Sequence, residues 1–394
     1  MSDKILALIR QTSGIQQSLI AGLIAYNQKR ANPLLINFFD PSVAKGDPQT
    51  LSEHTKNAGG ILAQVDSEEM DDLLKAVSLP VVNLAGTHES KHFPNYLFDH
   101  HSEAWLAYEL FSDRGYRNFC YVGFKDEKWC CLRCDEFRRK LKERGIHLST
   151  IWLSAEDAEQ GRIADQLISW LPVQETPLAL WACNNTVGSH VLEACSKAGI
   201  LVPDEVAVLG VGNETSSEGT LIPGLSSILL EGKEAGYSAA QELDRIMSNA
   251  SPTTLRYTYK IPAGGIRLSE STDAVVHDDP VVASAMRIIA KQACKGLHPS
   301  DVVDQISASR RCIERRFKEA TGKCILQHIK HVQCQRAKWL LSSSRMTLAE
   351  IAEHCGYEYV EHFSTTFKKI TGMTPGAYRK LKARSVDQIN ILRR

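Results

Sequence analysis

In roughly the first 270 residues, short apolar runs alternate with longer stretches in which apolar side chains recur every three or four positions. The short runs predict buried strands, which we expect at residues 5–9, 34–38, 60–63, 81–84, 119–122, 178–181 and 206–209. The longer stretches predict helices over residues 67–77, 104–111, 135–144 and 187–197. Asp66 followed by Glu69 indicates a capped start for the first of these helices.

This alternation is typical of a mostly parallel β-sheet with helices on its faces. It continues for more residues than one small doubly wound domain uses, because single hydrophobic cores rarely organise so long a segment. We therefore expect two α/β lobes with a cleft between them, which is where such folds commonly bind small ligands.

The pattern changes near residue 280. The stretch His277-Asp278-Asp279-Pro280 is polar, and its proline cannot continue a helix. Beyond it the strand-like runs stop and the sequence predicts only short helices. We expect an α/β domain at residues 1–275, a linker at 276–283, an all-α domain at 284–384 and a tail at 385–394.

The helical part contains an internal repeat. The stretch Phe317-Lys318-Glu319-Ala320-Thr321-Gly322 returns as Phe367-Lys368-Lys369-Ile370-Thr371-Gly372, and Ile313 matches Phe363 at the same offset. Upstream, the apolar positions of 302–306 match those of 351–355 after a difference of one residue in the turn. Two copies of a two-helix unit are the simplest interpretation.

Each copy predicts a short helix, a tight turn and a second helix. This is the arrangement of a helix-turn-helix unit, whose second helix enters the major groove of DNA. In the second copy, Thr347 and Glu350 predict a capping box, and Gly356 makes the turn. The polar positions expected to face outward and reach base edges are Arg310, Arg311, Glu314 and Arg315 in the first copy and Glu361, His362, Ser364 and Thr365 in the second.

The charge distribution supports DNA as the partner. Residues 280–394 contain 21 basic and nine acidic side chains, a net charge of +12, and because the whole chain is neutral the first 279 residues carry −12. A basic segment suits a polyanion, and arginine, carboxylate and hydroxyl groups suit base edges. The side chains expected at DNA phosphates are Lys318, Lys338, Lys368, Lys369 and Arg379. For any single lysine, a solvated surface position is an equal alternative.

Residues 285–383 resemble the DNA-binding module of AraC/XylS-type transcription regulators. The resemblance is carried by Arg336-Ala337-Lys338-Trp339-Leu340-Leu341, Ile351-Ala352-Glu353-His354-Cys355-Gly356-Tyr357, Phe363, Phe367-Lys368-Lys369, Thr371-Gly372-Met373-Thr374-Pro375 and Tyr378-Arg379. It implies second helices at 309–320 and 358–370, joined by a long helix through 325–341. It also implies a double-stranded DNA operator, a homodimer and RNA polymerase as partners, with activation favoured over repression.

Residues 4–272 resemble the periplasmic-binding-protein-like effector domain of LacI-type repressors. The resemblance is carried by Ala179-Leu180-Trp181-Ala182-Cys183-Asn184-Asn185, by the segment Ala198 to Gly210, by Pro223-Gly224-Leu225-Ser226-Ser227-Ile228 and by Gly236-Tyr237-Ser238-Ala239-Ala240. It implies a small-molecule effector between the lobes, a sugar such as xylose. The ligand contacts that it implies are Trp129, Arg133, Asn184 and Asn185, with Asp99 where the first lobe crosses to the second.

One departure from the family pattern concerns the ligand. In Gly210-Val211-Gly212-Asn213-Glu214, Gly212 stands where the family has the acidic residue that holds a sugar. If the ligand is a sugar, Asn213 or Glu214 is the candidate for that role. For Arg133 a surface salt bridge, and for Trp129 a core position, are equal alternatives to ligand contact.

Composition narrows the class of protein. The eleven cysteines are an odd number spread among apolar positions, which favours reduced thiols and a cytoplasmic location. The apolar run at the N-terminus ends at Arg10 and is too short for a signal peptide or a membrane span. The one CxxC, at residues 131–134, has no partner at ligand spacing, so we expect neither a metal nor another cofactor.

Three other classes compete with a ligand-controlled regulator. An α/β enzyme would share the cleft, but no GxSxG elbow, phosphate-binding glycine loop or carboxylate pair stands out, and we expect no enzyme. A transport-binding protein would have no use for the +12 segment. A DNA-binding protein that responds to no ligand is the third alternative.

Overall fold

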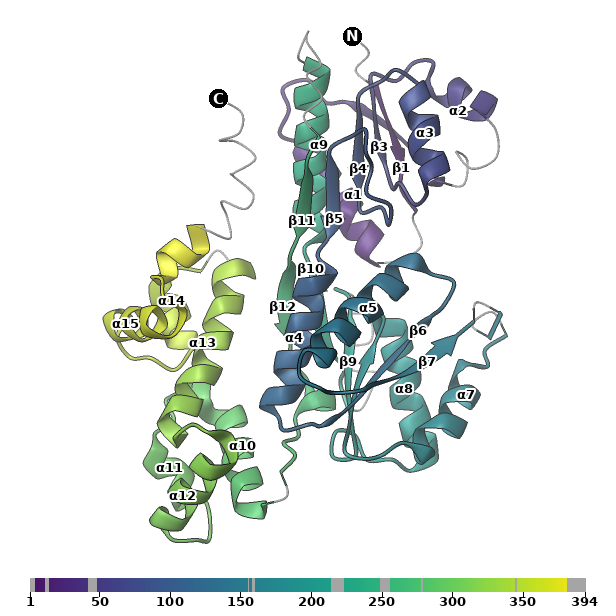
Figure 1. Ribbon diagram of the computed structural model, residues 1–394. Coiled ribbons are helices and arrows are strands. Elements are labelled where there is room, and N and C mark those ends of the chain that lie inside the picture. The colour runs from purple at the N-terminus through teal and green to yellow at the C-terminus, as the bar shows by residue number, and fades with distance from the viewer. Residues whose placement is uncertain are drawn as a thin grey trace.

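The computed structural model describes residues 4–10, 14–41, 48–154, 156–157, 160–213, 223–248, 256–277, 279–343 and 346–380. Two α/β lobes are stacked end to end, and a helical domain lies beside them (Figure 1). The expected fold class, a two-lobed periplasmic-binding-protein-like domain followed by an all-α domain with two helix-turn-helix units, is confirmed.

The first lobe is built on a six-stranded parallel sheet in the order β11-β5-β4-β3-β1-β2. Its strands are β1 (Lys4–Leu8), β2 (Leu35–Phe39), β3 (Gly60–Ala63), β4 (Val81–Leu84), β5 (Asn95–Phe98) and β11 (Thr258–Ile261). Its helices are α1 (Gly14–Asn27), α2 (Pro48–Thr55), α3 (Glu68–Ala76) and α9 (Gly232–Ser248). Because α1 and α9 cover one face and α2 and α3 the other, the strands are buried on both sides.

The second lobe has a six-stranded sheet in the order β12-β10-β9-β8-β6-β7, in which only β12 is antiparallel to its neighbour. Its strands are β6 (Asn118–Phe124), β7 (Leu148–Leu153), β8 (Leu178–Ala182), β9 (Val206–Val211), β10 (Ser226–Leu230) and β12 (Ala263–Arg267). Its helices are α4 (His100–Asp113), α5 (Lys128–Lys142), α7 (Ile163–Trp170) and α8 (Asn185–Ala198). Trp181 is fully buried at its centre, edge-on to Tyr121 and Phe137.

The chain crosses between the lobes three times, from β5 to α4, from β10 to α9 and from β11 to β12. Two crossings are joined by hydrogen bonds, since the Asp99 amide donates to the Ile261 carbonyl and the Ala263 amide donates to Ser102 Oγ, each over 2.8 Å. The first turn of α4 therefore lies at the hinge between the lobes.

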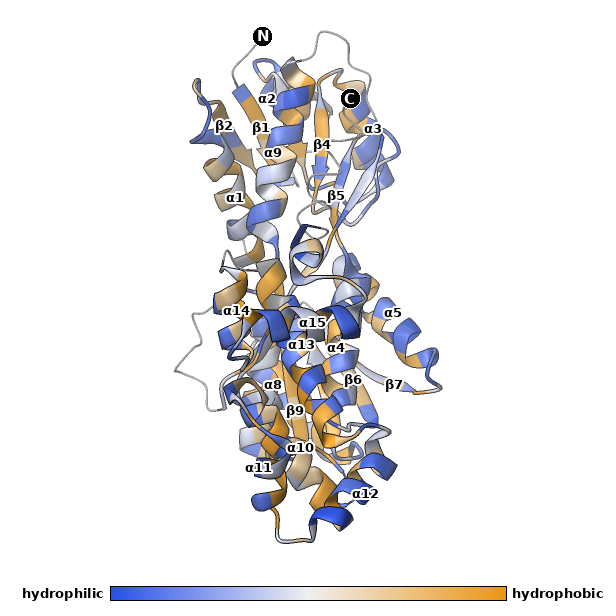
Figure 2. Cartoon of the chain, turned by 90° about the vertical axis from the view of Figure 1, so that its left-hand side faces the viewer, coloured by the Kyte–Doolittle hydropathy of each residue, from blue (hydrophilic) through white to orange (hydrophobic). Residues whose placement is uncertain are grey.

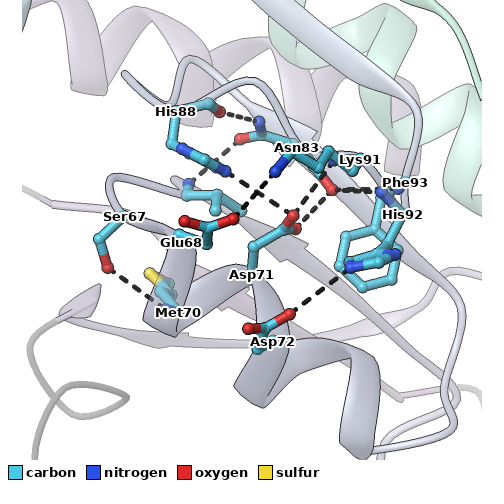
Figure 3. Close-up of polar contacts among 12 residues, drawn as sticks. Ser67, Glu68, Met70, Asp71, Asp72, Asn83, His88, Lys91, His92 and Phe93 are labelled. Atoms are coloured by element: carbon cyan, nitrogen blue, oxygen red, sulfur yellow. Dashed lines mark hydrogen bonds and ion pairs between the residues drawn. The ribbon is translucent and has the colours of Figure 1, made fainter.

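A buried carboxylate fixes the loop after β4 to helix α3. Asp71, 2% exposed, accepts hydrogen bonds from Ser90 Oγ at 2.5 Å and from the Lys91 amide at 3.1 Å, and His88 Nε2 lies 3.8 Å away (Figure 3). The Ser90 hydroxyl donates to the carboxylate and not to the histidine, so this is not the contact order of a nucleophilic triad. The network is structural.

The seven strands expected from the sequence are confirmed within one or two residues at each end. The expected capping of the 67–77 helix by Asp66 is wrong. The N-cap is Ser67, which accepts a hydrogen bond from the Met70 amide, and Asp66 turns away to pair with Arg10 and Thr87. The described helices include none long and apolar enough to cross a membrane.

The helical domain contains two helix-turn-helix units joined by one long helix. Its helices are α10 (Pro280–Gln292), α11 (Pro299–Asp304), α12 (Arg310–Thr321), α13 (Ile325–Ser343), α14 (Leu348–His354) and α15 (Val360–Thr371). The repeat extends to single hydrogen bonds, because Thr321 Oγ1 donates to the Phe317 carbonyl and Thr371 Oγ1 to the Phe367 carbonyl at 2.7 and 2.8 Å. The Thr347–Glu350 capping box is also confirmed.

The close approach of α1 and α9 yields the first testable prediction. A Cβ on Gly22 would lie 2.0 Å from the Lys233 carbonyl oxygen, so Gly22→Ala forces two backbones apart and should cost about 1–3 kcal/mol. Gly376→Ala, where a Cβ meets nothing within 4 Å, is the matched control. Thermal unfolding should show a lower Tm for Gly22→Ala alone, and equal Tm values for both variants would contradict this packing.

Candidate effector cleft and DNA-binding surface

Charged side chains from both lobes meet at the cleft. Arg10 follows β1 and Asp66 follows β3, and their side chains form an ion pair of 2.8 Å. Across the cleft, Arg10 Nη1 lies 4.0 Å from Glu127 Oε2, and Glu127 accepts a hydrogen bond of 2.7 Å from Trp129 Nε1. These contacts join the lobes through polar atoms beside an aromatic ring, which is how ligand clefts in α/β folds are commonly lined.

Behind Trp129, Arg133 is held from two sides. Its Nε donates to Glu103 Oε2 on α4 and its Nη1 donates to the Cys183 carbonyl after β8, each over 2.5 Å. The guanidinium lies 5.3 Å from the centre of the Trp129 ring. Both charged side chains are almost fully buried, at 5% exposure for Arg133 and 1% for Glu103. Burial alone would raise the pKa of Glu103, but Arg133 and His100 outweigh it and lower this pKa to about 2.

The asparagines that we expected to contact the ligand form hydrogen bonds within the second lobe. Asn184 caps α8 by accepting the Val187 amide, and Asn185 accepts the Ser227 hydroxyl. Asn213 exchanges two hydrogen bonds with the backbone of Leu230. Gly212 has φ of 145°, a conformation that side-chain-bearing residues rarely adopt. Glu214 lies outside the described residues.

Asp99 differs from these asparagines. It occupies the N-cap position of α4 at the hinge, half-buried, and its side chain does not cap the helix. No hydrogen bond or ion pair of its carboxylate is found within the described part of the chain. Of the seven residues expected at the ligand, Asp99 thus lies at the hinge, Trp129 lies beside the Arg10–Glu127 contact between the lobes, and Arg133 lies next to Trp129 with its Nε and Nη1 donors engaged.

Sequence reasoning missed Arg10, Glu103 and Glu127. Arg10 follows a strand whose carboxyl end faces the cleft, so the position alone indicated it. Glu103 falls in the first turn of α4, three residues after His100, and was missed because we expected the helix to begin at residue 104. Glu127 lies in the loop before α5 and carries no pattern of its own.

A separate cavity of about 970 Å³ lies between the α/β part and the helical domain. Its walls are α4, β12 with the start of α9, and α13. Trp105 and Glu109 line it from α4, and His328 and Gln335 from α13. His328 is 6% exposed, its Nδ1 has no hydrogen-bond partner among the residues that the structure describes, and burial lowers its pKa to about 4. The cavity also reaches the hinge between the lobes, because Ser102, Ile261 and Ala263 line it.

The second helices of both units, α12 and α15, face away from the two lobes (Figure 1). Seen from that side, much of both ribbons has the colour of hydrophilic residues (Figure 2). Ile313 and Phe317 of α12 and Phe363 and Phe367 of α15 are buried at 1% exposure or less, whereas Ile370 of α15 is exposed. The expected base-contacting residues Arg310, Arg311, Glu314, Arg315, Glu361, His362 and Thr365 are exposed, as are Lys318, Lys368 and Lys369, and Ser364 is half-buried.

Some of the basic side chains expected at DNA already have partners within the protein. On α12, Arg310 pairs with Glu314 at 2.9 Å and Arg315 with Glu319 at 3.0 Å, each one helical turn apart on the exposed face. Arg311 has no such pair among the described residues. Arg379, expected at phosphate, instead donates to the Met346 carbonyl at 2.6 Å, and it lines the inter-domain cavity together with Lys338.

Comparison with known proteins agrees with this division. A model of the periplasmic binding protein-like domain matches residues 108–266, and a model of a helix-turn-helix domain matches residues 302–381. The chain is 28% identical over 336 residues to the xylose operon regulatory protein of Escherichia coli (strain K12), an alignment that spans 82% of this chain and 84% of that protein.

The chain thus combines a periplasmic-binding-protein-like domain with a helix-turn-helix domain of the AraC type, the domain pair of a transcription regulator. The fold of the regulator is similar to a solved structure of the xylose-binding transcription activator xylR, with a TM-score of 0.58 and 24% identity over 96% of this chain and 98% of that one. It is also similar to the lac repressor dimer bound to operator, with a TM-score of 0.56 and 14% identity over 69% of this chain and 94% of that one. The relatives are regulators, which confirms the expectation that the chain is not an enzyme.

The buried Arg133–Glu103 pair should dominate the acid stability of the regulator. Because the pKa of Glu103 is lowered from 4.5 to about 2, its contribution is present above pH 4.5 and is lost as the pH falls toward 2. Glu103→Gln leaves a buried arginine without its counter-charge and should cost about 3–5 kcal/mol at pH 7. Urea unfolding of the parent and of Glu103→Gln at pH 7 and pH 3 measures the difference in their free energies of unfolding.

The matched control is Glu193→Gln, which removes an exposed ion pair with Lys197 and should cost at most about 1 kcal/mol. The destabilisation by Glu103→Gln should shrink at pH 3. A destabilisation that is the same at both pH values would contradict the assigned charge state.

The exposed face of α12 gives a prediction about DNA. Arg311→Ala should weaken binding to a specific operator by about 1–3 kcal/mol, because arginine can donate two hydrogen bonds to guanine. Lys368→Ala should weaken binding to all sequences alike, since it is expected at phosphate. Electrophoretic titration against operator and random DNA distinguishes the two effects. Equal losses on both DNAs for Arg311→Ala would make Arg311 a phosphate contact.

Proposed function

We propose that this regulator binds a small neutral sugar between its lobes and that the sugar controls its binding to a DNA operator. Xylose is the first candidate, because relatives of the chain are named for xylose. In this proposal residues 1–275 sense the ligand, 276–283 link the domains, 284–384 bind DNA and 385–394 form a tail. The observation that carries it is the set of hinge and strand-end groups around Trp129.

The charges at the cleft favour a neutral ligand over an anionic one. Arg10 faces Asp66 and Glu127, and Arg133 is paired with Glu103. Both guanidinium groups are thus already balanced by carboxylates, so a phosphate or carboxylate ligand would find no spare cation among these groups. The hydroxyl groups of a sugar can instead donate to carboxylates, and the Trp129 ring offers an apolar face.

The proposed output is activation of transcription. Two helix-turn-helix units on one face suit adjacent segments of major groove, and two copies of the chain as a homodimer would occupy two half-sites. The DNA-bound dimer would then recruit RNA polymerase in the cytoplasm. A ligand can change this binding only if it prefers one arrangement of the domains.

If the sugar binds between the lobes, substitution of Asp99 should strongly weaken sugar binding. Titration calorimetry with D-xylose should show one site per chain. Asp99→Asn should weaken the affinity for D-xylose about 10- to 100-fold, because a hydrogen bond to a charged group contributes about 1.5–3 kcal/mol. The matched control is Asp135→Asn, on the exposed face of α5. Unchanged affinity in Asp99→Asn would place the ligand elsewhere.

If D-xylose gives no heat, other pentoses and hexoses are the next probes. The DNA part is tested separately, by the binding of fragments of its own upstream region at moderate and high salt against random competitor DNA. A retained fragment whose affinity no sugar changes would support a DNA-binding protein that responds to no ligand.

A further inference from the structure

Helix α4 contacts both the effector cleft and the DNA-binding domain. At its start, Asp99 lies at the hinge and Glu103 binds Arg133 behind the cleft. Near its end, Glu109 accepts a hydrogen bond of 3.2 Å from Gln335, and Asp113 Oδ2 lies 2.9 Å from His331 Nε2. Glu103 and Asp113 are ten residues apart, about 15 Å along a helix axis.

We propose that α4 transmits effector binding to the DNA-binding domain through the contacts of Glu109 and Asp113 with α13. This inference rests on the proposed function, because it requires an effector in the cleft. It assigns a role to side chains that touch neither effector nor DNA.

The start of α4 is placed to respond to a ligand. The carboxylate of its N-cap residue, Asp99, has no hydrogen bond or ion pair among the described residues, and the Asp99 amide donates to the Ile261 carbonyl in another crossing strand. A ligand that bonds Asp99, or that displaces Trp129 and so disturbs Arg133, therefore acts on the first turn of α4. Since a helix is stiff over four turns, a shift of this turn moves the far end as well.

The far end of α4 faces α13 across a partly open interface. Between them lies the cavity of about 970 Å³, so α13 can shift without driving side chains into a close-packed core. Burial would raise the pKa of Asp113, but the hydrogen bond to His331 outweighs it and lowers this pKa, which keeps the carboxylate charged at the contact. A few polar contacts in an open interface can exchange at low cost, unlike a packed apolar one.

Helix α13 in turn supports both DNA-reading helices. Ile329 belongs to the same buried core as Phe317 of α12, and Leu341 belongs to the same buried core as Phe367 of α15. Its two ends are thus built into the two helix-turn-helix units. A rotation of α13 against α4 would change how both reading helices are presented to DNA.

The first test measures how much D-xylose changes the DNA affinity of the parent protein and of a variant in α4. In the double variant Glu109→Gln/Asp113→Asn, sugar affinity and DNA affinity without sugar should stay within about twofold of the parent. The ratio of DNA affinities with and without sugar, expected at about 5- to 150-fold for allosteric proteins, should fall to within about twofold of one. The control Asp165→Asn/Glu193→Gln removes the same charges from α7 and α8 and should leave the ratio unchanged. A parental ratio in the α4 variant overturns the proposal.

The second test needs no effector, so it separates failure of this inference from failure of the proposed function. Arg133→Lys keeps the charge opposite Glu103 but removes the hydrogen bond from Nη1 to Cys183. Hydrogen exchange of the α13 amides should change in this variant of the full chain. The change should disappear when Glu109→Gln/Asp113→Asn is added. Exchange in α13 that is unaltered by Arg133→Lys, or altered equally with and without the α4 substitutions, overturns the proposal even if xylose proves not to be the effector.

Discussion

The buried ion pair between Arg133 and Glu103 is the contact on which the cleft depends. Two charges taken out of water are costly unless they pair closely and find further hydrogen bonds. Here the Cys183 carbonyl accepts a second hydrogen bond from the guanidinium, and His100 Nδ1 lies 3.1 Å from Glu103 Oε2, whereas the buried Glu103 Oε1 has no hydrogen-bond partner among the described residues. The pair ties α4, α5 and the end of β8 together, so it fixes the floor of the cleft and the start of the helix that reaches the DNA-binding domain.

Much of the fold could be predicted from the sequence, because it depends on local patterns. Buried parallel strands such as β8 and β9 are continuous apolar runs, and the repeat in the helical domain places Phe317 and Phe367 on equivalent positions. Strands such as β12 were missed, since its sequence Ala-Gly-Gly-Ile-Arg has two glycines and little β-propensity. Its pairing with β10 comes from the tertiary fold alone.

The candidate site was less predictable, since it depends on which partner each polar group finds. Asn184, Asn185 and Asn213 have the right chemistry for a ligand, yet capping, a buried serine and a strand backbone use their hydrogen bonds. Arg10 and Glu127 lie about 117 positions apart in the chain, and no periodicity links them. Position at the end of a parallel strand is a better guide to the cleft than residue type.

The separation of charge along the chain organises the domains. The acidic α/β part contacts the basic domain on the α13 side and at the linker, where Asp273 lies 3.5 Å from Lys291 and Asp279 pairs with Arg316. Helices α12 and α15, which carry exposed cations, lie on the side of the helical domain that is turned away from the lobes (Figure 1). An acidic sensor repels DNA while this face attracts it, so the field of the whole chain favours approach in one orientation. Because both reading helices are anchored on α13, their spacing is set by one rigid element, and a signal that turns this element acts on both units at once.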